Sequence, residues 1–258
     1  MHVVVTGASS GIGAALAREL GKDAKDTVTL VARRKSAMDE LAKEIAAASN
    51  VIAHNLSDSA RATSWIAEAE ERSGPIDVMI NNAGVENTGF AHEADIAAGV
   101  SLIHTNMISP MLIARALLPG MVARRSGTIV NVASVAAFNA VKLQAWYGAS
   151  KAGFAMFSEV ARAEVREHGV HVVTVYPGPV KTPMAEAAYA VYGGRKGVVG
   201  LLPEGNPEKL ARLVRRAIEK KHDRVVYPTF YEIGRFLPWV SRFMSDRTPV
   251  ADHGRLKA

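Results

Sequence analysis

Short apolar runs alternate with segments of helical periodicity along almost the whole chain. The apolar runs are rich in Val and Ile, and several end at a glycine or proline turn, which is typical of buried strands. The predicted strands cover residues 2–7, 27–34, 51–56, 77–84, 127–134, 170–178 and 224–228.

The segments between the strands repeat apolar residues at positions three or four apart, which places them on one face of a helix. Alternation of short strands with helices predicts a parallel sheet buried on both faces, with right-handed crossovers. We therefore expect an α/β fold, a doubly wound parallel sheet of about seven strands. The predicted helices cover residues 11–21, 36–49, 59–74, 94–125, 146–169 and 206–221.

No internal repeat, low-complexity tract or linker divides the chain, so residues 1–258 are expected to form a single domain. Two segments depart from the alternation. Residues 178–206 are rich in Gly, Pro and Ala, and a loop of that length usually lines or covers a binding site, here a substrate-binding loop. Residues 229–258 form a C-terminal helical extension after the last predicted strand.

The composition excludes several classes of protein. No run of about 18 uncharged apolar residues suggests a transmembrane helix, and the start of the chain lacks the features of a signal peptide, so a cytoplasmic location is expected. The absence of Cys excludes disulfides, thiolate catalysis and Cys-ligated metal. The eight His residues show no ligand spacing, and no metal site is expected.

The net charge of +6 is unevenly distributed. Residues 195–258 hold 14 Lys and Arg against 7 Asp and Glu, whereas residues 1–194 hold 17 against 18. Nucleic-acid binding needs a basic surface on the fold itself, so this distribution argues against a nucleic-acid partner.

Two small-residue motifs point to one crevice. The glycine-rich turn TGASSGIG, Thr6–Gly13, joins the first strand to the first helix, and NNAG, Asn81–Gly84, ends the fourth strand. Glycines in the first turn let backbone N–H groups approach a pyrophosphate at the helix N-terminus, although a merely flexible turn has the same composition. Because the first and fourth strands flank the ligand crevice of a doubly wound sheet, the two motifs together favour a dinucleotide site.

These motifs belong to a larger ordered set that resembles the short-chain dehydrogenase/reductase family over about the first 182 residues. The resemblance implies a Rossmann-type fold and an oxidoreductase that interconverts an alcohol and a ketone or aldehyde by hydride transfer with a nicotinamide cofactor. The further matching residues are Asn106, Ser134, Tyr147, Lys151, Pro177 and Gly178.

The resemblance also implies which residues contact the cofactor. Asn55 stands where many family members have an Asp that binds the adenine amine, and its amide oxygen can still accept that bond. The Thr182 hydroxyl either binds the cofactor or only caps the next turn. The full set is Thr6, Gly7, Ser9, Ser10, Gly11, Ile12, Gly13, Arg33, Arg34, Asn55, Leu56, Asn82, Ala83, Gly84, Tyr147, Lys151, Pro177, Gly178, Val180 and Thr182.

The end of the second strand favours NADP(H) over NAD(H). An acidic residue there would bind the ribose 2′-hydroxyl of NAD, whereas an arginine favours the 2′-phosphate of NADP. The sequence has Ala32 at the acidic position, followed by Arg33 and Arg34, whose guanidinium groups match a phosphate in two-point hydrogen bonding. A solvated strand end, where Arg is common, is the alternative.

Tyr147 and Lys151 are one helical turn apart, so their side chains meet on one face. Reduction of a carbonyl needs a proton donor, and a nearby ammonium favours the phenolate and lowers the pKa of a tyrosine. We expect Tyr147 to be the general acid and base and Ser134 to hold the substrate oxygen. The resemblance implies that Lys151 binds the nicotinamide ribose and that Asn106 sustains a water-linked proton relay. Taken singly, each could be a capping, buried or surface residue.

The substrate is expected to contact Ser134, Val135, Gln144 and Tyr147, with Val85, Glu86 and residues 184–202 beside them. A non-catalytic dinucleotide sensor or structural subunit on the same fold is the alternative function. The resemblance implies a homodimer or homotetramer. The small residues of the predicted helix 146–169 that would permit close approach of a second subunit are Gly153, Ala155 and Ala161.

The extension is aromatic as well as basic. Phe236, Trp239 and Phe243 are three and four positions apart, so one face of a helix there would be aromatic, with Arg residues between. Such a face could pack on the body or on another subunit. It could also cover the substrate cleft and lie on an anionic membrane surface as a peripheral contact.

Overall fold

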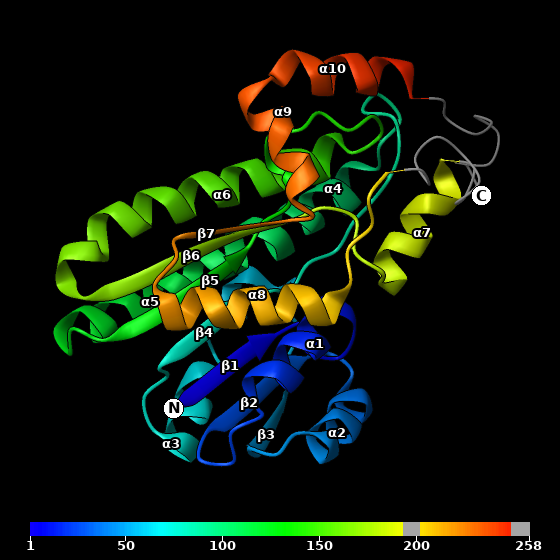
Figure 1. Ribbon diagram of the computed structural model, residues 1–258. Coiled ribbons are helices and arrows are strands. Elements are labelled where there is room, and N and C mark those ends of the chain that lie inside the picture. The colour runs from blue at the N-terminus through cyan, green and yellow to red at the C-terminus, as the bar shows by residue number, and fades with distance from the viewer. Residues whose placement is uncertain (193–201, 249–258) are drawn as a thin grey trace.

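The computed structural model describes residues 1–192 and 202–248 (Figure 1). Seven parallel strands form one sheet in the order β3-β2-β1-β4-β5-β6-β7, which confirms the predicted doubly wound architecture and strand number. The order reverses direction between β1 and β4. The strands are β1 (His2–Thr6), β2 (Thr27–Ala32), β3 (Ala48–Ala53), β4 (Val78–Asn81), β5 (Gly127–Val132), β6 (Val170–Pro177) and β7 (Arg224–Tyr227).

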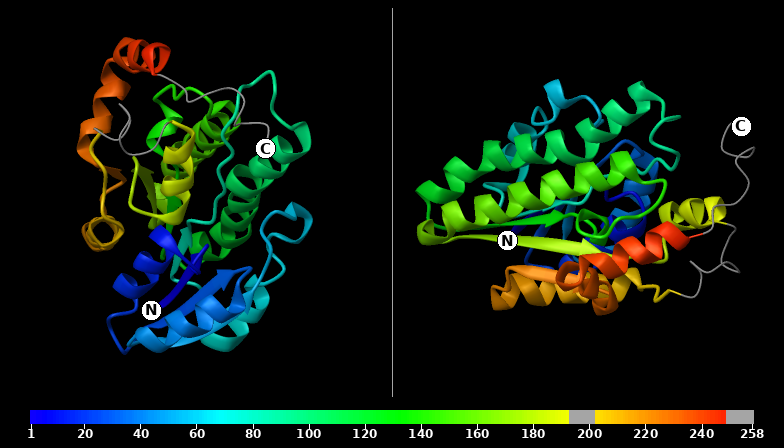
Figure 2. Two further views of the ribbon diagram at one scale, coloured as in Figure 1. Left: turned by 90° about the vertical axis from the view of Figure 1, so that its right-hand side faces the viewer. Right: turned by 90° about the horizontal axis from the view of Figure 1, so that it is seen from above.

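Helices cover both faces of the sheet (Figure 2). One face packs on α1, α2 and α8, and the other on α3, α5 and the end of α6, so alternate residues of each strand enter two separate apolar cores. In β1, for example, Val3 and Val5 enter the first core and Val4 the second. The α-helices are α1 (Gly11–Leu20), α2 (Lys35–Glu44), α3 (Ile66–Ser73), α4 (Ile96–Ile103), α5 (Ser109–Ala123), α6 (Ala145–Val165), α7 (Pro183–Val191), α8 (Pro207–Lys220), α9 (Ile233–Phe236) and α10 (Pro238–Arg247).

Several expected helices are shorter or interrupted. The helix expected over residues 36–49 ends at Glu44, because the chain turns at Ile45 and begins β3 at Ala48. The helix expected over residues 59–74 begins only at Ile66, after a 3₁₀ turn that is capped by Asp58. The spacing of apolar residues shows which side chains are buried. The same spacing can continue into a turn whose backbone is not helical, so it does not locate the end of a helix.

The long helix expected over residues 94–125 contains a change of geometry. Residues His104–Ile108 form a π-helical turn between α4 and α5. By length and composition the whole stretch Ile96–Ala123 could cross a membrane, a test that a core helix also passes. Its apolar composition has a structural cause in this fold, since Ile113, Leu117 and Met121 are buried in the core beneath the sheet.

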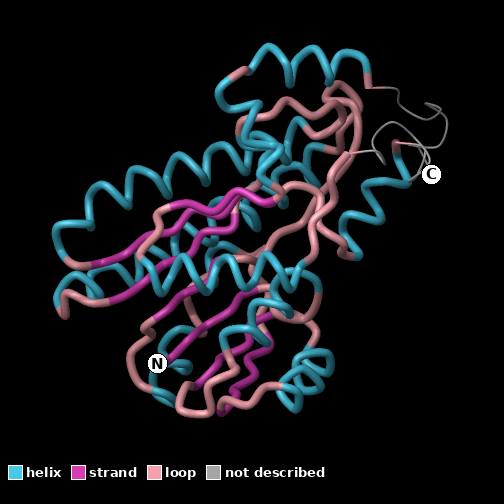
Figure 3. Tube along the Cα trace, viewed as in Figure 1, coloured by secondary structure: helices cyan, strands magenta, loops and turns pink. Residues whose placement is uncertain are grey.

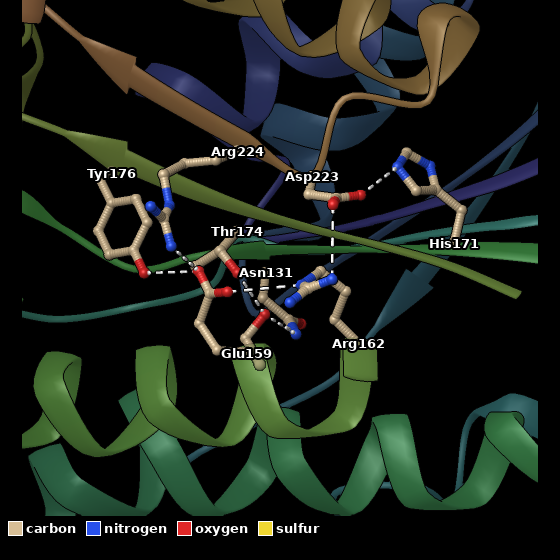
Figure 4. Close-up of polar contacts among 9 residues, drawn as sticks. Asn131, Glu159, Arg162, His171, Thr174, Tyr176, Asp223 and Arg224 are labelled. Atoms are coloured by element: carbon tan, nitrogen blue, oxygen red, sulfur yellow. Dashed lines mark hydrogen bonds and ion pairs between the residues drawn. The ribbon is translucent and has the colours of Figure 1, made fainter. Parts of the chain in front are cut away.

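The end of α6 is fixed to the sheet edge by polar contacts (Figure 4). Glu159 of α6 accepts hydrogen bonds from Arg224 of β7 and from the phenol of Tyr176 in β6. One turn later, Arg162 lies 3.5 Å from Asp223, which precedes β7. These contacts hold one end of α6 against β6 and β7, while the other end carries Tyr147 and Lys151.

The segment expected as the irregular loop 178–206 contains helix α7, which begins after Thr182. Part of that expected loop, residues 193–201, and the end of the expected extension, residues 249–258, lie outside the described residues. The capped helix and last strand expected after residue 206 are confirmed as α8 and β7, with the Asn206 side chain accepting a hydrogen bond from the Lys209 N–H.

Candidate active site

The loops that follow the strands gather at the carboxyl ends of the sheet (Figure 3). A cavity of about 380 Å³ opens among them. This is the point between β1 and β4 where the strand order reverses and where ligands bind in such sheets. Of the residues expected to bind cofactor or substrate, those that line it are Gly7, Ser10, Gly11, Ile12, Gly13, Asn82, Ala83, Gly84, Ser134, Val135, Gln144, Tyr147, Lys151, Pro177, Gly178, Val180 and Thr182.

The turn before α1 depends on glycine geometry. Gly7 has φ +66°, and a Cβ there would lie 2.8 Å from the Cα of Ala83, so the turn packs directly on the NNAG segment. Thr6 lies behind the cavity wall, where its hydroxyl donates to the Ile80 carbonyl and accepts from the N–H groups of Asn82 and Ala83. Thr6 thus joins the two motifs to each other and does not itself line the cavity.

The N-terminus of α1 is suited to an anion. Ser10 is its N-cap, its side chain makes no capping hydrogen bond, and the first turn has no acidic residue. Ser10, Gly11 and Ile12 line the cavity, so the unpaired N–H groups of the first turn and the positive end of the helix dipole are directed toward it. These features fit the diphosphate of a dinucleotide.

Positive charge lies beside this turn. The Arg34 guanidinium donates to the hydroxyls of Ser9 and Ser10, at 3.1 and 2.8 Å, and Arg33 is exposed next to it. No acidic side chain stands at the end of β2, where Ala32 is the last strand residue.

Besides Thr6, the expected cofactor residues that do not line the cavity are Ser9, Arg33, Arg34, Asn55 and Leu56. The Asn55 amide oxygen accepts hydrogen bonds from the N–H and the hydroxyl of Ser57, and Leu56 is buried in the core. The Leu56 carbonyl accepts a hydrogen bond from Ser109 of α5. The observed contacts of Asn55 and Leu56 are therefore local and structural.

Ser134, Tyr147 and Lys151 lie on one wall of the cavity. Ser134 follows β5, and its hydroxyl accepts from the Ala136 N–H at 3.1 Å, which fixes its orientation. Tyr147 and Lys151 are on the first two turns of α6, and the Lys151 Nζ lies 5.9 Å from the centre of the Tyr147 ring. The Lys151 ammonium donates to the Val132 carbonyl at 2.9 Å.

The electrostatics of Tyr147 differ from the sequence expectation. Burial raises the pKa of the phenol above its ordinary value, the Glu86 carboxylate raises it further, and a hydrogen bond with Ser134 opposes this shift. Burial also lowers the pKa of Lys151 to about 8, against the attraction of Glu86. The expected lowering of the Tyr147 pKa by Lys151 is absent here, because desolvation dominates and the ammonium binds a backbone carbonyl.

Asn106 is fully buried within the π-helical turn and does not line the cavity. Its amide donates to the Val85 carbonyl and accepts from the Val85 N–H, both at 2.8 Å, and it also donates to Ser150 of α6. A π-turn re-aims one side chain of a helix, and here it points Asn106 at the segment after NNAG. Asn106 therefore ties that segment to the start of α6.

Residues that follow β6 also line the cavity. A Cβ on Gly178 would lie 2.6 Å from the Tyr231 ring, so glycine is needed where the chain passes beneath that aromatic residue. The Thr182 hydroxyl accepts from the Ala185 N–H at 3.2 Å and so caps α7, while Thr182 also lines the cavity.

The C-terminal segment contributes to the cavity wall, as one of the sequence alternatives anticipated, but through residues other than its expected aromatic face. Tyr231, Val240 and Met244 face the cavity, and Tyr192, within the expected loop, joins them from the end of α7. The chain bends at Leu237 between α9 and α10, so the expected aromatic face is divided between two helices. Phe236, Trp239 and Phe243 are 69%, 65% and 51% exposed and do not line the cavity, so this aromatic face is not the part of the segment that meets the cleft.

Within residues 1–192 and 202–248, no three His, Asp or Glu side chains gather as metal ligands would.

Comparisons with known proteins agree with this geometry. A family model described as short chain dehydrogenase matches residues 1–192. The ketoacyl reductase HetN of Nostoc sp. (strain PCC 7120) is 34% identical over 228 residues, which cover 87% of this chain and 77% of HetN.

Two solved structures are similar over most of the chain. A short-chain dehydrogenase from Streptomyces avermitilis is 30% identical with a TM-score of 0.80, covering 95% of this chain and 96% of that one. A metagenomic short-chain oxidoreductase in complex with NADP is 31% identical with a TM-score of 0.71, covering 88% and 96%. This chain therefore belongs to the short-chain dehydrogenase/reductase family, and it is an oxidoreductase that acts on CH–OH and C=O groups with NAD or NADP.

Proposed function

We propose that the protein is an NADP(H)-dependent oxidoreductase that interconverts an alcohol and a ketone or aldehyde, with Tyr147 as general acid and base. The observation that carries this proposal is the shared cavity wall of Ser134, Tyr147 and Lys151, next to the open N-terminus of α1. A sensor or structural subunit would need the dinucleotide crevice but not a phenol and a hydroxyl facing the same space.

The nicotinamide ring, when bound, supplies the hydride for reduction or accepts it for oxidation. Ser134 holds the substrate oxygen by a hydrogen bond, and Tyr147 donates its proton to that oxygen as negative charge develops. The raised pKa of Tyr147 keeps the phenol protonated, which is the form that reduction requires. Lys151 moves a proton toward Tyr147 or stabilises its phenolate after the transfer, because its own pKa is lowered to about 8.

The preference for NADP(H) rests on Arg33 and Arg34. Arg34 already lies on the Ser9 and Ser10 hydroxyls beside the turn, and Arg33 is exposed next to it, so a 2′-phosphate would meet two guanidinium groups and no carboxylate. The NADP bound to the metagenomic relative is consistent with this choice.

The proposed function is tested by Tyr147→Phe. We expect the variant to bind NADPH with a Kd near that of the wild type, measured by NADPH fluorescence, and to lose at least about a hundredfold in kcat with a panel of ketones and aldehydes. Retained turnover would reject the proton-donor role. NADPH binding by a wild-type enzyme that reduces no carbonyl would instead favour the sensor.

For partners, we propose a homo-oligomer formed through the exposed apolar side chains of α4, α5 and α6. The small residues expected to form this contact are engaged within the chain: Ala155 and Ala161 are buried, and a Cβ on Gly153 would lie 2.5 Å from the Met107 sulfur. The apolar residues that do face outward on these helices are Ile96, Val100, Leu112, Met156 and Val160.

We further propose that the outward surface of α9 and α10 rests on an anionic membrane surface, and we call it the C-terminal patch. It combines exposed apolar side chains with guanidinium groups, and Asp246 is its one exposed acidic residue within the described chain. Arg235 and Arg247 lie over the rings of Phe236 and Phe243. The patch comprises Arg235, Phe236, Leu237, Trp239, Arg242, Phe243, Asp246 and Arg247. The predicted cytoplasmic location fits a peripheral contact of this kind.

A further inference from the structure

Glu86 is a carboxylate in the cavity wall, directly after the NNAG segment. It is the only acidic side chain among the described residues that line the cavity. Burial raises the pKa of Glu86 to about 7, against the hydrogen bond from Gln144 and the charge of Lys151. Burying a carboxylate is costly unless it is paired, so its position calls for a partner.

Glu86 is held in place by the neighbouring segment that precedes α6. Gln144, which precedes α6, donates a hydrogen bond from its side-chain amide to one Glu86 carboxylate oxygen. The same two segments are joined along the backbone, where the Gly89 N–H donates to the Leu143 carbonyl at 2.9 Å and Gly89 pairs with Gln144. Glu86 and Gln144 therefore form a fixed polar pair on an otherwise largely apolar stretch of wall.

Titratable side chains from α6 and from the end of α7 face the pair formed by Glu86 and Gln144. Tyr147 and Lys151 face Glu86 from α6, and Tyr192 faces it from the end of α7. Within the described residues, the second carboxylate oxygen of Glu86 makes no hydrogen bond, and an ionised carboxylate can only accept.

We propose that Glu86 and Gln144 form a recognition point for a hydrogen-bond donor on the substrate, a hydroxyl or an ammonium group at a distance from the reacting carbonyl. The inference rests on the proposed function and names its substrate class. A substrate donor satisfies the free oxygen of Glu86, whereas a substrate carboxylate at that place meets a like charge in a desolvated site.

The test uses ketones that differ only at one end: 4-(aminomethyl)acetophenone, 4-(hydroxymethyl)acetophenone, 4-ethylacetophenone and 4-acetylbenzoate. With NADPH at pH 8, Glu86 is ionised. We expect the wild type to show its highest kcat/KM for the two ketones that carry a hydrogen-bond donor, the aminomethyl and the hydroxymethyl compounds. We expect its lowest kcat/KM for the ketone that carries a carboxylate. In Glu86→Gln, the ratio of kcat/KM for the ammonium to that for the carboxylate should fall about tenfold or more.

A pH series separates recognition from a structural role. The quantity compared is kcat/KM for the aminomethyl ketone divided by kcat/KM for the ethyl ketone. In the wild type this ratio should rise between about pH 6 and pH 8 as Glu86 loses its proton. In Glu86→Gln the ratio should stay level. Both ketones use Tyr147 and Lys151 in the reaction itself, so that part of their titration is common to the two substrates. A direct effect of the Lys151 charge on the substrate ammonium would persist in Glu86→Gln, so the difference between the two proteins isolates Glu86. Glu93→Gln removes the same charge from the same loop outside the cavity and should change no ratio.

Equal ratios in Glu86→Gln and the wild type would overturn the proposal. If the wild type reduces none of the four ketones, the proposed function fails in this panel. In that case the proposed recognition point is tested by binding instead. The Kd of each compound for the NADPH-loaded protein is measured by quenching of NADPH fluorescence. Tighter binding of the two donors that depends on Glu86 would support it, and indifference to the substituent would reject it.

Discussion

At the scale of single residues, the chemistry of the cavity is decided by desolvation as much as by charge. The phenol of Tyr147 and the ammonium of Lys151 are both shifted toward their neutral forms, and Glu86 is shifted toward its protonated form. A neutral phenol is the form of Tyr147 that the proposed reduction requires. Positive charge brought by an oxidised cofactor would act in the opposite direction on Tyr147.

A residue-scale prediction concerns Arg33. Arg33→Ala removes one of the two guanidinium groups at the end of β2, and we expect the KM for NADPH to rise about tenfold to a hundredfold while the KM for NADH changes less than threefold. Steady-state kinetics with both cofactors measure this. Lys35→Ala, an exposed neighbour that pairs with Asp39, serves as the control for lost positive charge. Equal effects on both cofactors would contradict the NADP assignment.

At the scale of elements, α6 links the sheet edge to the cavity. Glu159 anchors it to β6 and β7, twelve residues after Tyr147. Glu159→Gln keeps the shape but leaves Arg224 without its counter-charge, so we expect the free energy of unfolding at pH 7 to fall by about 1–3 kcal/mol. Urea denaturation measures the change. Glu164→Gln, on an exposed position of the same helix, should stay within about 0.5 kcal/mol of the wild type.

The same carboxylate gives a pH dependence with a defined sign. Burial alone raises the pKa of Glu159, but hydrogen bonds and charges from Arg224, Tyr176 and Arg162 hold the pKa below its ordinary value. A lowered folded-state pKa contributes stability above the unfolded pKa of about 4.3 and loses it as the pH falls through the folded value. The wild type should therefore lose more stability than Glu159→Gln between pH 6 and about pH 3. Parallel losses would show that Glu159 does not contribute.

At the scale of the whole molecule, α9 and α10 have two different sides. Val240 and Met244 line the cavity, whereas the C-terminal patch faces away from it. One short segment, α9 and α10 (Figure 1), thus carries both lining residues of the cavity and an exposed aromatic and cationic surface. A membrane contact through the patch would bring the cavity close to lipophilic substrates.

We expect the protein to co-sediment with vesicles of phosphatidylcholine and phosphatidylglycerol at low salt and to be released as salt rises, because Debye screening weakens the contribution of Arg242 and Arg247. The double variant Trp239→Ser and Phe243→Ser should bind about tenfold more weakly. Ile96→Ser changes an apolar residue 72% exposed on α4, in the proposed oligomer contact. It should bind as the wild type does when light scattering shows the same particle mass for both proteins. No binding at low salt, together with a smaller particle in light scattering for the double variant, would assign the patch to a second copy of the chain.

The sequence by itself determined the sheet, its helices and the family. Strand composition, helical spacing and glycine turns are local properties, and β1 to β7 follow the predicted runs within a few residues. It also determined which residues gather at the strand ends, because parallel strands bring their carboxyl ends to one edge. Ser134, Tyr147 and Lys151 are the clearest case.

Only the tertiary structure decided the rest. The π-turn at Asn106, the bend at Leu237 and the outward direction of Phe236 depend on what packs against each segment, and apolar spacing alone does not carry that information. The pKa shifts of Tyr147 and Glu86 likewise have no local signal. They arise because segments distant in sequence exclude water from one cavity and place a carboxylate beside a phenol.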